Sequence, residues 1–375
     1  MKNKIQYLAF DSLEEGVGAS QILNYLSRLS KNFEITLVNF EKSPPSDVMR
    51  QKMLGIGVDW QPLAFGQEGT FYGLIRVIRL MTKIDKKIPV HARGDLAALA
   101  AVMSGNKQVL WDCRALQADQ RFAIASGKSK YVTYLINRVI ELVIAKKSKL
   151  INVITHPAAR ILARRYDLPT SKFSIISTCV DLETFPLRKM PTQSVLRLLI
   201  PGTLSGAYDI PLMNKIILEL RGLCTLEVTL AVGNGADTYW KQVDYDYVKS
   251  VSHSEIPNEI ANSHFGMSIW KSNLGICLSS VSSTKIPEFL ATGRPVIANF
   301  NQGDIGKFLE TYECGVTTSL CTVQHVKEYV EEILRLLSDE STVGRCRGLA
   351  ENYYSLSDAV SQLGQIYMEI QEIGR

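Results

Sequence analysis

The stretch at residues 279–299, SSVSSTKIPEFLATGRPVIAN, constrains the fold most, because it prescribes a short helix followed directly by a strand. Residues 282–284 are of the types that cap helix N-termini, and Pro287 is tolerated in a first turn. Gly293 suits the left-handed position just past a last helical turn. Residues 295–298 are apolar without polar alternation, which is typical of a strand buried on both faces. The stretch therefore predicts an α/β protein with a parallel sheet.

The same stretch has the composition of an anion site. A polar loop that enters a helix presents free backbone N–H groups, and Lys285 adds a positive charge there. Glu288, one turn into the helix, can accept hydrogen bonds from a diol. Phosphate near Ser283, Thr284 and Lys285 with ribose at Glu288 would accommodate a nucleotide. The alternative is an ordinary capped helix in which Lys285 and Glu288 form a solvated pair.

The segment STKIPEFLATGRPVIA resembles the donor site of family 4 glycosyltransferases, which have the GT-B fold and a K-x-x-E-x-x-A-x-G-x-P-V motif. Further segments that resemble motifs of this family follow one another in the same order along almost the whole chain. The family usually carries two glutamates separated by seven residues. Glu288 matches the second, whereas Ser280 stands where the first, which contacts the donor sugar, would be.

The resemblance implies two doubly wound, Rossmann-like domains facing a cleft, with a C-terminal helix crossing back to the first domain. It also implies sugar transfer from a nucleotide-diphosphate sugar with retained configuration and without a metal ion, because basic groups and helix dipoles stabilise the leaving diphosphate. We expect the donor to be bound by Gly202, Thr203, Ser283, Thr284, Lys285 and Glu288. Ser280 would take the place beside the sugar.

Two further stretches predict the acceptor side. The first strand, from Ile5, leads into a loop with Gly16 and Gly18, and in the family this loop faces the cleft. A second strand is expected to end at Leu110 or Trp111 and to deliver Asp112, Arg114 and Asp119 into a loop. Loops beyond the carboxyl ends of strands hold the ligand in doubly wound sheets. Asp112 or Asp119 would serve as a base and Arg114 would bind the acceptor, unless Asp112 and Arg114 form a structural ion pair.

The order of patterns predicts the domain organisation. Residues 1–185 would form the acceptor-side domain, and the proline-containing segment 186–195 would be a linker. Residues 196–352 would bind the donor, and residues 353–375 would form the helix that packs back on the first domain. The donor domain departs from the family once more. No basic residue occurs from Thr203 to Asp209, where an arginine and a lysine often hold the diphosphate, so Lys285 would carry that task.

The charge is distributed unevenly along the chain. Residues 1–185 contain 26 Lys and Arg and 16 Asp and Glu, whereas the complete chain has a net charge of +5. The basic residues alternate with apolar ones at helical spacing, without the aromatic interleaving typical of nucleic-acid binding. We expect peripheral association with an anionic membrane surface or a pyrophosphate-bearing acceptor. Solvated helix faces are the alternative.

The remaining sequence features concern the compartment. The first residues turn acidic directly after a short apolar run, which is not the pattern of a signal peptide, and no run is long enough for a membrane span. The seven cysteines are scattered without a CxxC pair, as in a cytoplasmic protein with reduced thiols. We therefore expect a cytoplasmic location, with association at the inner face of the membrane.

These features favour a glycosyltransferase of the hexosyl type that transfers sugar to a glycan or lipid-linked hydroxyl acceptor in capsule, surface-polysaccharide or glycolipid biosynthesis. Two alternatives remain open. One is a degenerate homologue that binds a nucleotide or a partner without turnover, which the missing glutamate at Ser280 keeps in view. The other is a GT-B nucleotide-sugar epimerase, although only five histidines are available for that chemistry.

Overall fold

The chain in the computed structural model forms two compact units, residues Met1–Ile176 with Ser357–Arg375, and residues Ser177–Leu356. The structure describes residues 2–14, 18–67, 69–125, 127–192, 194–202, 204–232, 239–252, 254–319 and 322–372. Two predicted site residues, Gly16 and Thr203, lie outside these ranges.

The first unit is built on a seven-stranded parallel sheet in the order β3-β2-β1-β4-β5-β6-β7. Its strands are β1 (Asn3–Leu8), β2 (Phe33–Glu41), β3 (Val58–Ala64), β4 (Val90–Arg93), β5 (Val109–Cys113), β6 (Leu150–Val153) and β7 (Phe173–Ile175). The first strand along the chain lies inside the sheet, and the direction of winding changes between β1 and β4. This position is the topological switch point, where doubly wound sheets bind ligands.

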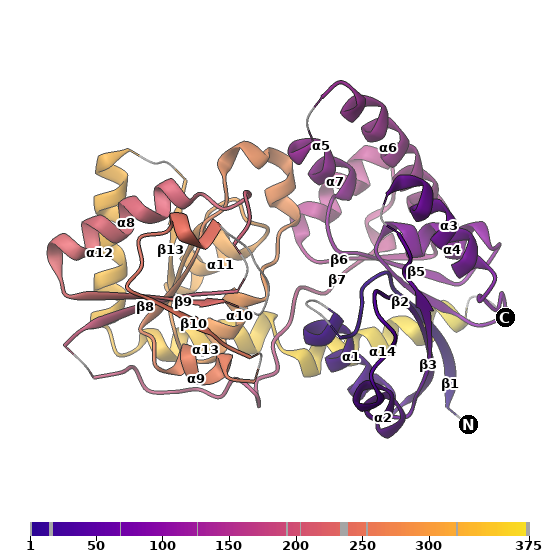
Figure 1. Cartoon of the computed structure of the whole chain (residues 1–375), viewed down its shortest axis with the longest axis horizontal. Helices are drawn as coiled ribbons and strands as arrows, with labels where there is room; N and C mark the ends of the chain where they lie inside the picture. The colour runs from indigo at the N-terminus through magenta and orange to yellow at the C-terminus, as the bar shows by residue number, and fades with distance from the viewer. Residues whose placement is uncertain are drawn as a thin grey trace. The chain divides into compact units, whose positions relative to one another are not determined.

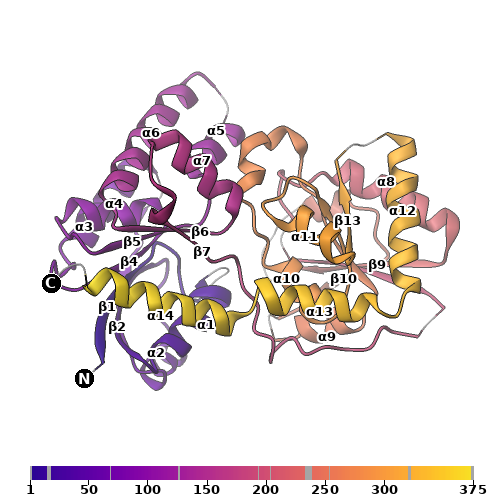
Figure 2. The ribbon, with the colours of Figure 1, turned by 180° about the vertical axis from the view of Figure 1, so that it is seen from behind.

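Helices cover both faces of this sheet (Figures 1 and 2). The helices are α1 (Leu23–Leu29), α2 (Asp47–Gly55), α3 (Thr70–Met81), α4 (Asp95–Met103), α5 (Gln117–Ile124), α6 (Ser129–Lys147), α7 (His156–Tyr166) and α14 (Leu356–Glu372). Side chains of α3, α4, α6 and α7 form one apolar core with the central strands. Helix α14 lies against the other face, beside α1 and α2, so the last helix of the chain completes the first unit (Figure 2).

The second unit repeats this plan with a six-stranded parallel sheet in the order β10-β9-β8-β11-β12-β13. The strands are β8 (Leu196–Pro201), β9 (Leu226–Val232), β10 (Tyr247–Ser250), β11 (Phe265–Ser268), β12 (Val296–Asn299) and β13 (Gly315–Thr318). The helices are α8 (Ile210–Leu223), α9 (Ile256–Ala261), α10 (Lys285–Ala291), α11 (Ile305–Tyr312), α12 (Val323–Ser338) and α13 (Thr342–Tyr353). Helices α8 and α12 share one core cluster, and α10, α11 and α13 share another. Its switch point lies between β8 and β11.

The predicted helix–strand unit around residues 279–299 is present. Helix α10 ends before Gly293, which has φ +83°, and all four residues of β12 are buried. Arg294, between them, is completely buried and donates hydrogen bonds to the backbone carbonyls of Ser263, Arg188, Lys189 and Ala261 at 2.7–2.9 Å. A buried guanidinium in this position therefore fastens residues 188–189, which we predicted as linker, to the second unit.

The segment after Ile176 also belongs to the second unit. Val180 pairs with Ser355 in a parallel bridge, and Val180 and Phe185 are buried in the cluster around α10 and α13. Residues 177–185, which the sequence predicts as part of the first domain, therefore belong to the second unit. Among the described residues, no helix is both long and apolar enough to cross a membrane.

Candidate functional site

The switch point of the second unit begins with Gly202, directly after β8. This glycine has φ +84°, a conformation that side chains rarely adopt. A Cβ atom at this position would lie 2.6 Å from Cε of Lys285. The absence of a side chain thus allows the lysine from the start of α10 to lie directly over the turn. The structure brings together Gly202 and Lys285, which are 83 residues apart in the sequence.

Lys285 is fixed by an aromatic pair. Its Nζ donates a hydrogen bond of 3.2 Å to the hydroxyl of Tyr208 and lies 5.3 Å from the centre of that ring. Tyr208 stacks on Trp270, which follows β11, with 4.8 Å between ring centroids. The side-chain amide of Asn299, at the end of β12, holds the backbone N–H and C=O of Trp270. One connected set of contacts therefore joins the carboxyl ends of β8, β11 and β12.

Glu288 lies in the first turn of α10, as predicted, and is half-buried. Its carboxylate makes no hydrogen bond or ion pair with the described residues. The amine of Lys285 bonds to Tyr208 instead and affects Glu288 only through its charge. Burial raises the pKa of Glu288 to about 8, and the charge of Lys285 opposes this shift. An unpaired, desolvated carboxyl group is thereby kept beside the lysine, ready to hydrogen-bond hydroxyl groups.

The start of α10 differs from the prediction in its capping. Thr284 is the N-cap residue but has helical φ of −63°, and its side chain accepts no capping hydrogen bond. Ser283 Oγ accepts a long hydrogen bond of 3.4 Å from the Lys285 N–H. Ser282 instead joins this loop to residues 177–178, through Ser177 Oγ at 2.8 Å and Thr178. Since α10 has only seven residues, its dipole contributes little, and Lys285 is the main positive group at this turn.

Ser280 is buried at the end of a 3-10 segment, Ser272–Ser280. Its Oγ donates a hydrogen bond of 3.0 Å to the carbonyl of Cys277. The segment bends at Gly275, whose φ is +56° and ψ −125°. The hydroxyl group that replaces the family's first glutamate is therefore turned toward its own backbone.

Three polar side chains near the ends of β11 and β12 have buried atoms without a hydrogen-bond partner in the described part of the chain. They are Ser268 Oγ, Trp270 Nε1 and both amide atoms of Gln302. The Gln302 N–H bonds to the carbonyl of Asn299, and the next residue, Gly303, bonds to Leu278 near Ser280. Buried polar groups nearly always have partners, so unsatisfied ones indicate a place for water or a ligand. No sequence motif marks Tyr208, Trp270 or Gln302, so these three residues were not predicted.

In the first unit, Asp112 lies within β5 and not in the loop beyond it, because the strand extends to Cys113. It is buried with its carboxylate between His91, Arg93 and Arg114, at 3.3, 3.5 and 3.5 Å. The Asn152 amide donates to it at 2.8 Å. Burial alone would raise the pKa of Asp112, but Arg114, His91 and Arg93 outweigh it and hold the pKa well below its usual range. Asp112 is therefore ionised, holds the neighbouring arginine side chains in place and is a poor base.

His91 links this cluster to the C-terminal helix. Its Nε2 faces Asp112, and its Nδ1 lies 2.7 Å from the hydroxyl of Tyr367 on α14. Burial lowers the pKa of His91, against the effect of Asp112, so the ring is neutral. With Asp112 ionised, Nε2 carries the hydrogen and Nδ1 accepts from Tyr367. No sequence motif predicts this contact, because His91 and Tyr367 lie in distant segments of the chain.

Asp119 is separate from this cluster. It lies in the first turn of α5 and forms a two-point ion pair with Arg165 of α7, at 2.6 and 3.1 Å. Tyr134 of α6 donates to the same carboxylate at 3.3 Å. A nearly buried, doubly paired carboxylate joins three helices and is not available as a base, so Asp119 has a structural role here.

The exposed carboxylate of the Asp112 cluster is Asp11, just after β1. Its side chain is 42% exposed and accepts a hydrogen bond of 3.2 Å from Nε of Arg93, at the end of β4. Arg93 and Arg114 both donate to the Gln21 side chain, which precedes α1. The pair Asp11–Arg93 thus occupies the switch point of the first unit. Gly18 begins the π-helical segment Gly18–Ile22, and a Cβ there would collide with the carbonyl of Ser12, so a glycine is needed for this segment to pack against the residues after β1.

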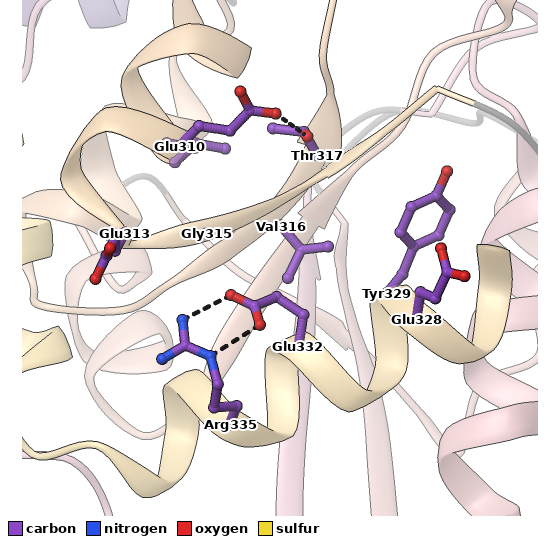
Figure 3. Close-up of a pocket in the computed structure, with 10 residues that line it drawn as sticks. Glu310, Glu313, Gly315, Val316, Thr317, Glu328, Tyr329, Glu332 and Arg335 are labelled. Atoms are coloured by element: carbon purple, nitrogen blue, oxygen red, sulfur yellow. Dashed lines mark hydrogen bonds and ion pairs between the residues drawn. The ribbon is translucent and has the colours of Figure 1, made fainter.

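A cavity of about 380 Å³ lies beside the edge strand β13, but its lining does not suit a nucleotide (Figure 3). Its charged residues are Glu310, Glu313, Glu328, Glu332 and Arg335. Arg335 is already held by both oxygens of Glu332, at 2.7 and 2.8 Å. Four carboxylates with one neutralised arginine repel a diphosphate. Within the described ranges, no group of three or more His, Cys, Asp and Glu side chains could hold a metal ion.

Comparison with known structures identifies the fold. A glycosyltransferase from Rickettsia africae superposes with a TM-score of 0.70 at 13% identity, covering 98% of both chains. HepE of Anabaena, solved with UDP, gives 0.69 at 11% identity, covering 98% of this chain and all of that one. The fold is that of the GT-B glycosyltransferases. The predicted fold class is confirmed, whereas no protein-family model and no curated protein matches the sequence.

A further structural neighbour has a different described activity. A putative UDP-N-acetylglucosamine 2-epimerase from Listeria monocytogenes superposes with a TM-score of 0.59 at 14% identity, covering 97% of this chain and 95% of the other. At such identities the likeness establishes the fold, and the chemistry has to be argued from the residues at each site.

Proposed function

We propose that this protein is a nucleotide-sugar-dependent glycosyltransferase that transfers a hexosyl group to a hydroxyl acceptor. The observation that carries the proposal is the placement of Lys285 over Gly202, with the unpaired Glu288 one turn further along α10. A cation, an open backbone turn and a free carboxyl group at a switch point match the diphosphate and ribose of a nucleotide. HepE of Anabaena, one of the neighbours, has been solved with UDP-glucose.

In this proposal, Lys285 neutralises the charge that develops on the leaving diphosphate, with no metal ion required. Gly202 allows the backbone to approach the phosphates, and Glu288 accepts hydrogen bonds from the ribose hydroxyls. The unsatisfied amide of Gln302 and the indole N–H of Trp270 would bind polar groups of the donor. We propose retention of configuration from the family resemblance of the α10 segment.

We place the acceptor at the switch point of the first unit. There Asp11 is the exposed carboxylate, and Arg93, fixed by Asp112 and Gln21, supplies positive charge. Asp11 can accept a hydrogen bond from the acceptor hydroxyl, and Arg93 holds Asp11 in place through its Nε. The chemistry is that of a glycan or lipid-linked acceptor in surface-polysaccharide or glycolipid synthesis.

The test is thermal unfolding of the purified protein with UDP, GDP, CDP and their sugars, in buffer containing EDTA. One nucleotide family should stabilise the protein, by about 2.7 kcal/mol at a hundredfold excess over its Kd. Lys285→Ala should weaken binding about ten- to a hundredfold, which corresponds to the loss of a charge-assisted hydrogen bond of about 1.5–3 kcal/mol. Lys307→Ala, an exposed lysine of α11, is the matched control and should bind like the wild type.

Stabilisation that is equal in the wild type and in Lys285→Ala would contradict the proposed site. Nucleotide binding without sugar transfer to any acceptor would favour the degenerate homologue. In that case the replacement of the family's first glutamate by Ser280, whose hydroxyl bonds to the Cys277 carbonyl, would explain the missing activity.

The likeness to the Listeria protein favours one second candidate, an epimerase. The protein and UDP-N-acetylglucosamine would be incubated without acceptor in deuterated water. Deuterium incorporation into the sugar would support epimerisation, whereas a transferase leaves the carbon-bound hydrogens unexchanged.

A further inference from the structure

Helix α6 exposes an apolar face that the fold does not use. Six large apolar side chains on this helix are between 39% and 64% exposed. They are Tyr131, Val132, Leu135, Ile136, Val139 and Leu142. Their spacing of one, three and four residues places them on one side of the helix. We call this set the α6 face.

The opposite side of the same helix packs into the core. Ile144 and Ala145 are completely buried in the cluster with α4 and the central strands. Glu141 is also fully buried and is paired with Arg165. Helix α6 is therefore apolar on both its inner and its outer side. A helix with this distribution is normally covered on both sides, so the exposed side calls for a partner.

The charges around the α6 face are of one sign. Residues 120–150 contain seven basic residues and a single acidic one, the buried Glu141. Lys128, Lys146 and Lys147 are exposed at the two ends of the helix. Asp119, which accepts a hydrogen bond from Tyr134 of α6, is buried in its ion pair with Arg165, and the exposed Asp167 contacts Lys146 through its backbone carbonyl. The surface thus combines apolar side chains with uncompensated cations.

A protein partner and a membrane make different demands on such a face. Interfaces between proteins are poor in lysine and usually bury polar contacts as well. An interfacial helix on an anionic bilayer has its apolar side among the acyl chains and its lysines at the headgroups. The lysines at both ends of α6 and the absence of exposed carboxylates on it match the second arrangement.

We propose that the α6 face docks on the surface of an anionic lipid membrane. The apolar side chains enter the headgroup–acyl boundary, and Lys128, Lys146 and Lys147 lie near the lipid phosphates. This inference goes beyond the proposed transfer reaction and is independent of it, since no residue of the α6 face belongs to the donor or acceptor cluster. It gives the basic first half of the chain a defined contact surface.

The test is flotation of the full chain with vesicles of phosphatidylcholine, alone or with phosphatidylglycerol. We expect binding to the vesicles that contain phosphatidylglycerol, and release as salt screens the charges. Leu135→Gln/Val139→Gln should reduce binding at least tenfold. Lys128→Gln/Lys147→Gln should reduce it by roughly twenty- to thirtyfold on the anionic vesicles, at about 1 kcal/mol for each cation.

The matched control is Leu218→Gln/Leu223→Gln on α8, which removes two equally exposed leucines from the second unit and should leave binding unchanged. All variants should keep wild-type nucleotide stabilisation and melting temperature, because the substituted side chains are exposed. Equal binding to neutral vesicles, or undiminished binding by Leu135→Gln/Val139→Gln, would overturn the proposal. A wild-type dimer that does not bind lipid and becomes monomeric in Leu135→Gln/Val139→Gln would also overturn it, because the α6 face would then join two copies of the chain.

Discussion

Glu288 combines burial with the absence of a hydrogen-bond partner, and the two together make it sensitive to pH. Its pKa is about 8 in the folded protein, against 4.5 for an ordinary glutamate. The folded state therefore binds the proton more tightly than the unfolded state. The contribution of Glu288 to the free energy of unfolding is fully present below about pH 4.5. It is lost as the pH rises through 8, by about 1.4 kcal/mol for each unit of pKa shift.

Glu288→Gln removes this titration and should flatten the dependence of stability on pH. The free energy of unfolding, measured in urea at pH 5 and pH 9, should fall less in the variant, which should be the more stable protein at pH 9. Glu340→Gln changes an exposed carboxylate of the same unit and serves as control. An unchanged slope in Glu288→Gln would mean that other groups cause the pH dependence.

Gln302 allows stability and binding to be separated. Both polar atoms of its amide are buried and unsatisfied, which costs about 1–3 kcal/mol for a buried group without a partner. Gln302→Leu should therefore raise the free energy of unfolding of the unliganded protein while weakening nucleotide-sugar binding several-fold. Isothermal titration and urea unfolding measure the two effects. Gln324→Leu, at an exposed position of α12, should change neither, and loss of stability in Gln302→Leu would show that the amide is satisfied in solution.

At the residue scale, the sequence pointed to Lys285, Glu288 and Gly202 because motif spacing and glycine chemistry are local. It could not reveal Tyr208 or Gln302, whose importance arises from burial and from contacts made by distant segments. Asp112 was identified as a notable residue but assigned to a loop. Its burial among two arginines and a histidine depends on the pairing of β4 with β5, which the sequence alone does not show.

At the scale of elements, the turn after β8 is the most constrained feature of the donor side. Gly202→Ala would place a Cβ 2.6 Å from Lys285 Cε in a backbone conformation with φ +84°. We expect a loss of about 1–2 kcal/mol of stability, together with weaker nucleotide binding because Lys285 must move. Gly222→Ala, inside α8 with open space around it, should instead stabilise by up to about 1 kcal/mol. Chemical denaturation of both variants checks the contrast, which would fail if both changes had the same sign.

Most elements were predictable because their patterns are complete within a short window. The apolar run at β8 and the helical spacing at α6 and α12 identify themselves without tertiary contacts. Helix α11 and strand β13 are harder to predict. They are eight and four residues long, and β13 lies at the edge of the sheet, where a short segment carries little apolar signal.

At the scale of the whole molecule, the first unit depends on α14, through Tyr367. Tyr367→Phe removes the hydroxyl that bonds to His91 and leaves a buried ring nitrogen without a partner, at a cost of about 1–3 kcal/mol. Hydrogen exchange should accelerate in peptides from β4 and β5 and remain unchanged in peptides from β8 and β12. Tyr353→Phe, on α13, is the control. Equal acceleration in both units would mean that they unfold together.

The discontinuity of the first unit also has a consequence for biosynthesis. The second unit is contiguous, so all its strands have left the ribosome before α14 is made. The first unit must wait, after residue 176, for roughly 180 further residues, on the order of ten seconds or more at ordinary elongation rates. A polypeptide that terminates early can therefore complete its second unit while His91 still lacks Tyr367. The first unit therefore lacks the last contact of the Asp112 cluster until the chain extends through Tyr367.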